Sequence, residues 1–464
     1  MDSALLIRKY ITVGIILLFI GSGIISTNAH VTKKDTSSIN ILKNHSPIRI
    51  IGNDEFLPEN GVTGGSGTEE DPYLIENWVI ISDGSASEGI FINNTDAYFI
   101  IKNCTIRGFS NPDEFYQGIE FSEVTHGHIQ DTNVSESGIG IYIRYSAGNE
   151  IKNCRCYDCP VYPEGYGIEI YRSTNTTIVS STCYNMSYGI FLSHSSDLTL
   201  QKTICYDNKQ SGVMSFADGD TRMNYRIEEC MFWNNTWYGV YLCGPLKKSS
   251  HSIIRNCSFY YNKRNGMNLI NTWDAIVENC VFTHNGDGLS IYDRSQNNTI
   301  RNCSFLSQNN TGLTIAGEAL FFSFAKNTEI SYCTFENNAN GLFLAMARDT
   351  KVHHCIITND SFTGMLSFLS TPKITQNNIF NNGHNWSENG SAGMVIWNSL
   401  CDLRNNWWGS PQGPSINLLL ITKLIHLRTI PDGDEVVMLK WFVRGFTTFR
   451  PWLSAPVPDA GRQT

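Results

Sequence analysis

The chain has no run of clustered basic residues. Its 34 lysines and arginines are outnumbered by 43 aspartates and glutamates, which gives 464 residues a formal net charge of -9 at pH 7. Neutralising the phosphates of a nucleic acid requires clustered lysine and arginine side chains. The composition therefore argues against a nucleic-acid partner and is typical of a mildly acidic soluble protein.

Long helical segments and a phosphate-binding loop are also missing. Short clusters of Asn, Ser, Asp and Gly separate the apolar segments, and nothing between them is long or periodic enough for a crossover helix. The glycine-rich stretch at 61–68 lacks the Gly-Lys-Ser/Thr ending of a phosphate loop, and no helical pattern follows it. Strands are the regular elements that remain.

What the sequence does contain is one short phrase repeated many times. It is clearest at 254–259, Ile-Arg-Asn-Cys-Ser-Phe, and it returns unchanged at 300–305. Close variants stand at 277–282 and 330–335, and more degenerate copies extend on both sides. A phrase that returns this often is the signature of a repeat architecture.

A second phrase, a glycine followed by alternating apolar residues, interleaves with the first. Alternation with period 2 indicates a short strand, in which Gly+1 and Gly+3 face one side and Gly+2 faces the other. Strands that recur in one direction without helices must wind as a solenoid, with coils about 4.8 Å apart. The sequence therefore predicts an all-β fold, a single-stranded parallel β-helix of about 13 coils with caps at both ends. The leading glycines are Gly89, Gly118, Gly140, Gly167, Gly189, Gly212, Gly239, Gly266, Gly288, Gly312, Gly341, Gly364 and Gly393.

The N-terminal segment has the pattern of an export signal. Arg8 and Lys9 precede an apolar run at 10–25, and small residues lead to Ala29. Residues 1–29 are therefore predicted to be a secretory signal that is cleaved after Ala29. An uncleaved membrane anchor is the alternative, because the run is close to the length that spans a bilayer. Either form places the body of the protein in the secreted or cell-surface space.

The rest of the chain divides into a linker, two caps and the coils. The polar stretch 30–47 is typical of a linker. Residues 48–81 are interpreted as an N-terminal cap, because an open first coil would expose core and strand edges. The coils are expected over 75–408, and a C-terminal cap and tail over 409–464.

The tail is expected to cover part of the body. A contiguous exposed apolar patch usually marks a covered or interacting surface, and the late coils have apolar residues at outward positions. We therefore predict that residues 416–453 pack sideways over the coils of 341–397, which leaves the ligand face nearer the N-terminus. The outward positions concerned are Phe343, Leu366, Phe368, Val395 and Trp397.

Fourteen cysteines in an exported chain would normally indicate a disulfide framework. Their positions in the repeat predict free thiols instead, because parallel Cβ vectors about 4.8 Å apart exceed the usual Cβ separation of a disulfide. In such a column cysteine acts as a small apolar residue. The expected ladder comprises Cys104, Cys154, Cys230, Cys257, Cys280, Cys303, Cys333 and Cys355, with Cys156, Cys183 and Cys205 in a second column.

Several phrases together resemble a known family. They are Gly64-Gly-Ser-Gly-Thr with Asp71-Pro-Tyr-Leu-Ile-Glu, the repeated Asn-Cys-Ser-Phe and Asn-Asn-x-Gly-Ile, and Asn405-Asn-Trp-Trp-Gly-Ser-Pro-Gln-Gly-Pro. Over roughly residues 60–455 the chain is similar to right-handed parallel β-helix proteins of the pectate-lyase-like superfold, nearest to NosD-type and archaeal surface proteins. The resemblance implies a right-handed coil, export and often a carbohydrate-binding or carbohydrate-processing role. The NosD name also implies delivery of copper to nitrous-oxide reductase.

Outward residues of the early coils combine aromatic, acidic and basic side chains. Function in a solenoid is expected on outward positions, because inward residues are committed to packing. Aromatic rings stack on sugar rings, and arginine hydrogen-bonds hydroxyls or uronates. A polysaccharide or glycoconjugate is therefore the expected partner, and a solvated sheet face is the alternative. The expected ligand-binding residues are Tyr142, Arg144, Tyr171, Arg172, Phe191 and Tyr241.

Two carboxylates on the same face support a second hypothesis, a glycoside hydrolase or polysaccharide lyase. Glu120 and Glu169 lie two coils apart in one column, so their backbones are expected about 9.6 Å apart. That is near the separation at which an acid and a base flank a water in an inverting glycosidase. The clustered aspartates of polygalacturonase-like relatives and the acidic calcium site of calcium-dependent lyases do not occur at repeat spacing.

No cofactor is predicted. The metal candidates are His126 with His128 and His353 with His354, and neither pair has a third ligand at a suitable spacing. Adjacent residues of a strand face opposite sides, so His353 and His354 are not expected to chelate one ion. The sequence supports neither calcium nor copper.

Two further roles stay open. One is a NosD-like accessory role in copper-site maturation, and the other is a structural surface scaffold without a small ligand. Asn-x-Ser/Thr sequons such as those at Asn44, Asn133 and Asn175 could be glycosylated in an exported protein. Others coincide with the repeated Asn-Cys-Ser/Thr phrase, so the repeat itself generates the match.

Overall fold

The computed structural model describes residues 42–463, except for 112, 115, 160–164, 218–220, 246–250, 319–322, 385–391, 421–424, 429–432 and 441–446. The predicted signal or anchor at 1–29 lies outside the described residues. In the described part of the chain, no helix is long and apolar enough to cross a membrane. Residues Leu42–Thr464 form one compact unit, in which short strands are the main regular element.

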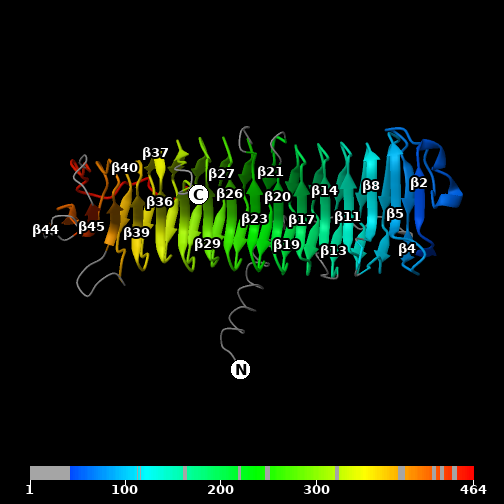
Figure 1. The fold of residues 1–464 in the computed structure, drawn as a ribbon, viewed down its shortest axis with the longest axis horizontal. Helices are drawn as coiled ribbons and strands as arrows, with labels where there is room; N and C mark the ends of the chain where they lie inside the picture. The colour runs from blue at the N-terminus through cyan, green and yellow to red at the C-terminus, as the bar shows by residue number, and fades with distance from the viewer. Residues whose placement is uncertain are drawn as a thin grey trace, which may run out of the picture. The chain divides into compact units, whose positions relative to one another are not determined.

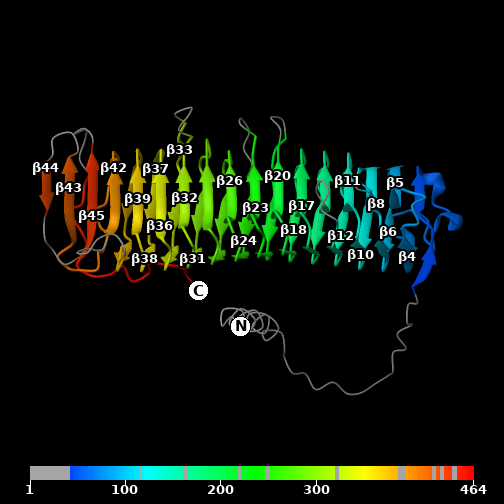
Figure 2. The same ribbon diagram turned by 60° about the horizontal axis from the view of Figure 1, so that its bottom comes forward.

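Three sheets surround one core, and successive coils add strands to each sheet in turn (Figures 1 and 2). Sheet A holds β1 (Lys43–His45), β4 (Trp78–Ile81), β7 (Thr105–Arg107), β10 (Asn133–Ser135), β13 (Arg155–Tyr157), β16 (Thr182–Tyr184), β19 (Ile204–Tyr206), β22 (Met231–Trp233), β25 (Ser258–Tyr260), β28 (Val281–Thr283), β31 (Ser304–Leu306), β35 (Thr334–Glu336), β38 (Ile356–Thr358) and β41 (Asn378–Phe380).

Sheet B carries the glycine-led strands. It holds β2 (Ile48–Ile51), β5 (Glu88–Thr95), β8 (Gln117–Val124), β11 (Ile139–Arg144), β14 (Tyr166–Tyr171), β17 (Tyr188–Ser193), β20 (Ser211–Phe216), β23 (Tyr238–Cys243), β26 (Asn265–Ile270), β29 (Asp287–Tyr292), β32 (Thr311–Ala316), β36 (Asn340–Ala345), β39 (Thr363–Phe368) and β42 (Ala392–Trp397), followed by β45 (Gly433–Lys440), β43 (Pro414–Leu420) and β44 (Ile425–Arg428).

Sheet C completes each coil. It holds β3 (Tyr73–Glu76), β6 (Phe99–Lys102), β9 (Gly127–Gln130), β12 (Glu150–Lys152), β15 (Thr177–Val179), β18 (Thr199–Gln201), β21 (Arg226–Glu228), β24 (Ile253–Arg255), β27 (Ile276–Glu278), β30 (Thr299–Arg301), β33 (Ala325–Lys326), β34 (Glu329–Ser331), β37 (Ala347–His353) and β40 (Thr371–Thr375). Two short 3-10 helices, η2 (Asn53–Glu55) and η3 (Pro58–Asn60), precede the first full coil.

The predicted parallel β-helix is confirmed. Each predicted glycine is the second residue of a sheet B strand, from β5 to β42, and neighbouring strands pair in parallel. Three strands of sheets A and B also form within the stretches predicted as linker and cap: β1 pairs with β4, which lies in the predicted cap as well, and β2 pairs with β5. The boundaries between linker, caps and coils stay predictions.

The glycine column is required by the close approach of successive coils. A Cβ atom added to Gly189 would lie 2.6 Å from the carbonyl oxygen of Gly212 and 3.2 Å from the Cβ atom of Cys205. The other central positions of the column are equally tight, as at Gly288, where the carbonyl oxygen of Gly312 would lie 2.4 Å away. A side chain at these positions would force the coils apart, which explains why the glycine recurs in every coil.

The Asn-Cys-Ser-Phe phrase forms the turn from sheet C to sheet A. Asn256 has a φ of 54°, in the left-handed region that asparagine tolerates better than most residues. Cys257 then points into the core, where its thiol lies 3.2 Å from the carbonyl oxygen of Arg255. The eleven cysteines of the two columns are free thiols, as predicted, and Cys159, Cys243 and Cys401, which lie off the columns, are free as well. Burial raises the pKa of the Cys104 thiol to about 11, so this thiol stays protonated at neutral pH.

The last residue of the phrase builds an aromatic stack inside the core. Phe259, Phe282, Phe305 and Phe335 occupy equivalent positions in β25, β28, β31 and β35, and each is fully buried. Their ring centroids are 4.7, 4.9 and 4.8 Å apart, with the rings nearly parallel. The repeat of one phenylalanine per coil therefore fills the core with a continuous column of rings.

An amide ladder runs through the turn between sheets A and B. Asn262 donates its Nδ2 hydrogen to Asn285 Oδ1 in the next coil at 3.0 Å and to the carbonyl oxygen of Phe232 in the coil before at 3.1 Å. Asn208, Asn235, Asn338 and Asn382 repeat this pattern, whereas Gln308 donates its Nε2 hydrogens to the carbonyl oxygens of Phe282 and Leu306. Because each amide serves as donor and acceptor, the ladder satisfies buried polar groups that the turn would otherwise leave unpaired.

The prediction that residues 416–453 cover the late coils sideways is wrong. β45 pairs with β42 in parallel, with Val437 beside Val395, and β43 and β44 follow as further strands of the same sheet. The tail thus extends sheet B past its last coil. The backbone groups at the edge of β42 need partners, and β45 supplies them. Of the outward side chains, Val395 is buried beside Val437, whereas Phe343 and Leu366 stay partly exposed and Trp397 is 36% exposed.

The end of the chain does lie along the coils, but on another side. The backbone N–H of Leu403 donates to the carbonyl oxygen of Thr448, and that of Val457 donates to Asn378 Oδ1. Further on, the backbone N–H of Gln463 donates to Asn302 Oδ1 at 2.5 Å. Residues 448–463 therefore run back along the turn between sheets C and A (Figure 2).

Candidate functional site

The early strands of sheet B bring together the residues that the sequence singles out. In β11, Tyr142 is in register with Glu120 of β8 on one side and with Glu169 of β14 on the other. Arg144 and Tyr171 are in register in the neighbouring outward column. Three successive coils therefore present two acids, one arginine and two tyrosines on one outer surface, which we call the sheet B face.

The same face continues through later strands. From Phe191 in β17 the column passes through Met214 to Tyr241 in β23. Arg172 follows directly after β14, and its guanidinium lies 5.5 Å from the ring centre of Tyr171. All the predicted ligand-binding residues thus lie on the sheet B face or at its margin, and their roles stay predictions.

Glu120 and Arg144 form the main ion pair of the face. Arg144 Nε donates to Glu120 Oε1 at 2.6 Å; the Glu120 side chain is 5% exposed and that of Arg144 36% exposed. Burial raises the pKa of Glu120, and the hydrogen bond from Arg144 opposes that rise. The carboxylate is therefore fixed in position, while the remaining N–H groups of Arg144 are available at the surface.

Glu169 has a different environment. It is in register with Tyr142 and Phe191, so aromatic side chains flank it on both sides. Burial raises the pKa of its carboxyl group to about 7. At neutral pH this group is close to half protonated, so it can either donate or accept a hydrogen bond. Burial raises the pKa of both glutamates, and only Glu120 has an arginine partner that opposes the rise.

An aromatic cluster next to this column was not predicted from the sequence. Tyr166 and Tyr188 stack at 5.7 Å, and the ring of Phe191 tilts against both at 5.0 and 5.4 Å. Ile139 and Met214 complete a small apolar cluster on the outside of the sheet, separate from the core. Strict alternation would turn the residue before each glycine inward with Gly+1 and Gly+3, so the recurring Tyr-Gly phrase did not reveal the outward position of Tyr166 and Tyr188.

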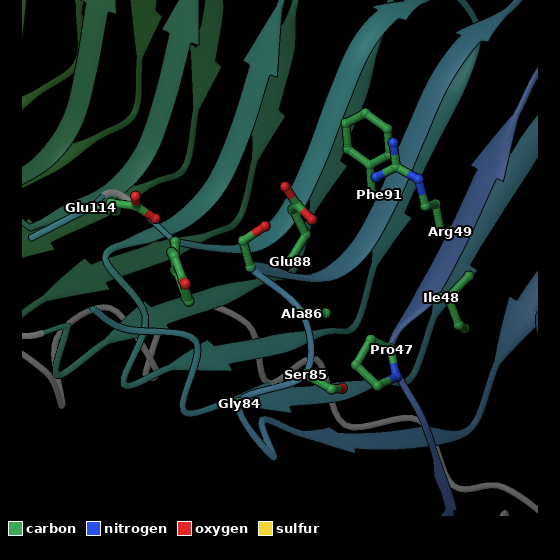
Figure 3. Close-up of a pocket in the computed structure, with 11 residues that line it drawn as sticks. Pro47, Ile48, Arg49, Gly84, Ser85, Ala86, Glu88, Phe91 and Glu114 are labelled. Carbon is green, nitrogen blue, oxygen red and sulfur yellow. The ribbon is translucent and has the colours of Figure 1, made fainter.

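A pocket of about 420 Å³ lies at the N-terminal end of the sheet B face. Its lining includes Arg49 of β2, Glu88 and Phe91 of β5, and Glu114 and Tyr116 from the segment before β8 (Figure 3). Arg49 is in register with Phe91, and its guanidinium lies 4.3 Å from the centre of that ring. Phe91 is in turn in register with Glu120. The pocket is therefore continuous with the column of candidate residues.

His126 and His128, the first pair of metal candidates, contact different residues and do not share a site. The ring of His126 stacks on Tyr98 at 4.2 Å, whereas His128 Nδ1 lies 3.4 Å from Glu150. In the part of the chain that the structure describes, no group of three or more His, Cys, Asp or Glu side chains could hold a metal ion.

The expectation that His353 and His354 face opposite sides is wrong, because their rings lie in contact. β37 ends at His353, and His354 has a φ of 55°, which turns its ring back toward its neighbour. The two Nδ1 atoms are 3.0 Å apart, and His353 Nε2 lies 3.2 Å from Glu329. The opposite-face rule applies within a strand, and His354 has already left it.

The coils and the outer face define a class of protein, the parallel β-helices. The family model described as the right handed beta helix region matches residues 88–245 and 246–407, more than half of the chain, so the chain belongs to this family. No curated protein matches it.

Several solved structures share the fold. They include a variant of the periplasmic alginate epimerase AlgG (14% identity, 65% of this chain and 82% of that chain, TM-score 0.44), the Dettilon tailspike protein (14%, 62% and 59%, 0.47) and the A-module of an Azotobacter vinelandii mannuronan C-5 epimerase (14%, 72% and 85%, 0.41). At these identities the likeness concerns the fold alone, so a role for the sheet B face must be argued from its own residues.

Proposed function

We propose that this protein is exported and binds a polysaccharide or glycoconjugate along the sheet B face. The observation that carries the proposal is the row of partly exposed tyrosine and phenylalanine rings beside Glu120, Arg144 and Glu169. Aromatic rings cover the apolar faces of sugars, and charged groups hydrogen-bond the hydroxyls at their edges. The signal-like pattern at 1–29 supports export.

Tyr142→Ala is expected to weaken glycan binding about fivefold to tenfold, since the loss of one aromatic contact costs about 1 kcal/mol or slightly more. Its ring lies between the two glutamates, and the guanidinium of Arg144 lies 6.0 Å from its centre. A glycan array identifies the ligand, and titration calorimetry then compares the variant with the unaltered protein. Tyr171→Ala should act in the same direction.

The matched control is Tyr184→Ala. Tyr184 is a partly buried aromatic residue of β16, on the outside of sheet A, where it stacks between Tyr157 and Tyr206. It should leave glycan affinity unchanged. If all three variants bound the glycan with the same affinity, the sheet B face would not be the binding surface.

A specific observation favours a second function, hydrolysis of the bound glycan. Glu169 has a pKa of about 7 and can serve as a general acid near neutral pH. Glu120 lies two coils from Glu169 in the same column, and its carboxylate is held in position by Arg144. Because an acid must be protonated, activity should fall as pH rises through about 7. The expected pair of results is product release from polysaccharides by the unaltered protein and loss of that release in Glu169→Gln, with glycan affinity retained. Absence of products across acidic and neutral polysaccharides would leave binding as the whole function.

A further inference from the structure

The pocket lies at the N-terminal end of the described sheet B face. β2 is the first strand of sheet B in the described residues, and Arg49 on it stands over Phe91, which begins the column that leads to Glu120. Figure 3 shows Pro47 and Ile48 of this first strand region at one side of the pocket and Glu88 at another. A glycan that followed the column would enter the pocket with its end.

The volume and lining suit one sugar ring. About 420 Å³ lies within the range of small-molecule sites. Phe91 is 8% exposed and is in register with Glu120 on the sheet B face. The guanidinium of Arg49 stacks on its ring, which holds the guanidinium in place. A guanidinium can donate to two neighbouring hydroxyl oxygens, and carboxylates can accept from hydroxyl groups. The pocket thus provides donors and acceptors around an aromatic side chain.

The charge of the lining selects among sugars. The lining holds two carboxylates, those of Glu88 and Glu114, and one guanidinium, that of Arg49. Neither glutamate forms an ion pair with a described residue. A uronate would therefore bring a third negative charge to a site with a single positive one, whereas an amino group would gain two acceptors.

We infer that this pocket binds the terminal residue of the glycan, and that Glu88 and Glu114 select a terminal sugar without negative charge. The inference rests on the proposed binding along the sheet B face, and it adds that the protein recognises chain ends. An oligosaccharide with an accessible end should therefore bind more tightly than the same oligosaccharide with that end blocked.

The test uses the full protein and an array of oligosaccharides that share their internal chains and end in glucose, glucosamine or glucuronate. Glucosamine-terminated and glucose-terminated chains are expected to bind at least about tenfold more tightly than glucuronate-terminated chains, because Glu88 and Glu114 repel the uronate carboxylate. Glu88→Gln should reduce this preference severalfold. Glu59→Gln removes an exposed carboxylate of the N-terminal segment outside the pocket and is the matched control, with no expected change.

Three outcomes are distinguishable. If no oligosaccharide binds the unaltered protein, the proposed function fails and this inference with it. The pocket inference alone is overturned if oligosaccharides bind and Tyr142→Ala weakens their binding, but affinity does not depend on the chain end. In that case the identity of the terminal sugar, a bulky block on either end and Glu88→Gln would all leave affinity unchanged. A preference for uncharged or amino-bearing ends that Glu88→Gln reduces, and that Glu59→Gln leaves intact, supports it.

Discussion

Phe282→Ala is expected to lower the free energy of unfolding by about 4 kcal/mol. The ring is fully buried between Phe259 and Phe305, at 4.7 and 4.9 Å. Those two rings are fixed by their own coils, so they cannot collapse into the space, and the cavity stays open. Denaturant titration followed by tryptophan fluorescence or circular dichroism measures the loss.

Phe362→Ala is the control for that experiment. Phe362 is 47% exposed, so its removal from the surface should change stability by less than about 1 kcal/mol. If the two variants lost the same stability, the ring column would not be the core element that its geometry indicates. A loss confined to Phe282→Ala would show that the repeated phenylalanine is retained for packing.

Asp360→Asn is expected to stabilise the protein, by on the order of 5 kcal/mol above pH 8. Asp360 occupies a position in the amide ladder, and its Oδ1 accepts both N–H groups of Asn338, at 2.8 and 2.9 Å. Its Oδ2 stands where the other members have an amide nitrogen, and it has no hydrogen-bond partner among the described residues. An asparagine there would restore the missing donor.

The sign of the pH dependence follows from the same geometry. Burial raises the pKa of Asp360 to about 8, from 3.8 in an unfolded chain. The folded protein therefore holds a proton that the unfolded chain releases between about pH 4 and pH 8, so this residue lowers stability progressively as pH rises through that window. Below about pH 4 both states are protonated and the penalty disappears. The advantage of Asp360→Asn should grow from pH 4 to pH 8 and then level off.

Thermal unfolding at a series of pH values measures this advantage. Asp402→Asn is the contrasting variant, because Arg404 holds the pKa of Asp402 down at about 2, and loss of that pairing should destabilise slightly. A gain from Asp360→Asn that did not depend on pH, or a loss at pH 8, would contradict the assignment of a neutral carboxyl group within the ladder.

Much of the fold could be predicted because the repeat makes the same physical demand in every coil. Glycine recurs where the next coil's carbonyl leaves no space for a Cβ atom, as at Gly189, and asparagine recurs where the chain adopts a left-handed turn, as at Asn256. The tail could not be placed in the same way. A continuous apolar stretch such as 436–439 fits either a covering layer or one more strand, and only the unpaired edge of β42 decides between them.

The candidate site was predictable in part for the same reason. Residues at Gly+2 and Gly+4 follow from strand alternation, which placed Glu120, Tyr142 and Glu169 on one face. The pocket was not predicted, because it forms where β2 meets the segments before β5 and β8, which are far apart in sequence. The close contact of His353 and His354 was also missed, since it depends on a single left-handed residue.

Hydroxyl-radical footprinting with a bound oligosaccharide tests the central claim most directly, because it reports the exposure of individual aromatic side chains. Tyr142, Tyr171 and Phe191 on the sheet B face should become protected when the glycan is added. Tyr184 and Trp233, in the stack on the outside of sheet A, should react at an unchanged rate. Protection of the sheet A stack with no change on the sheet B face would contradict the account.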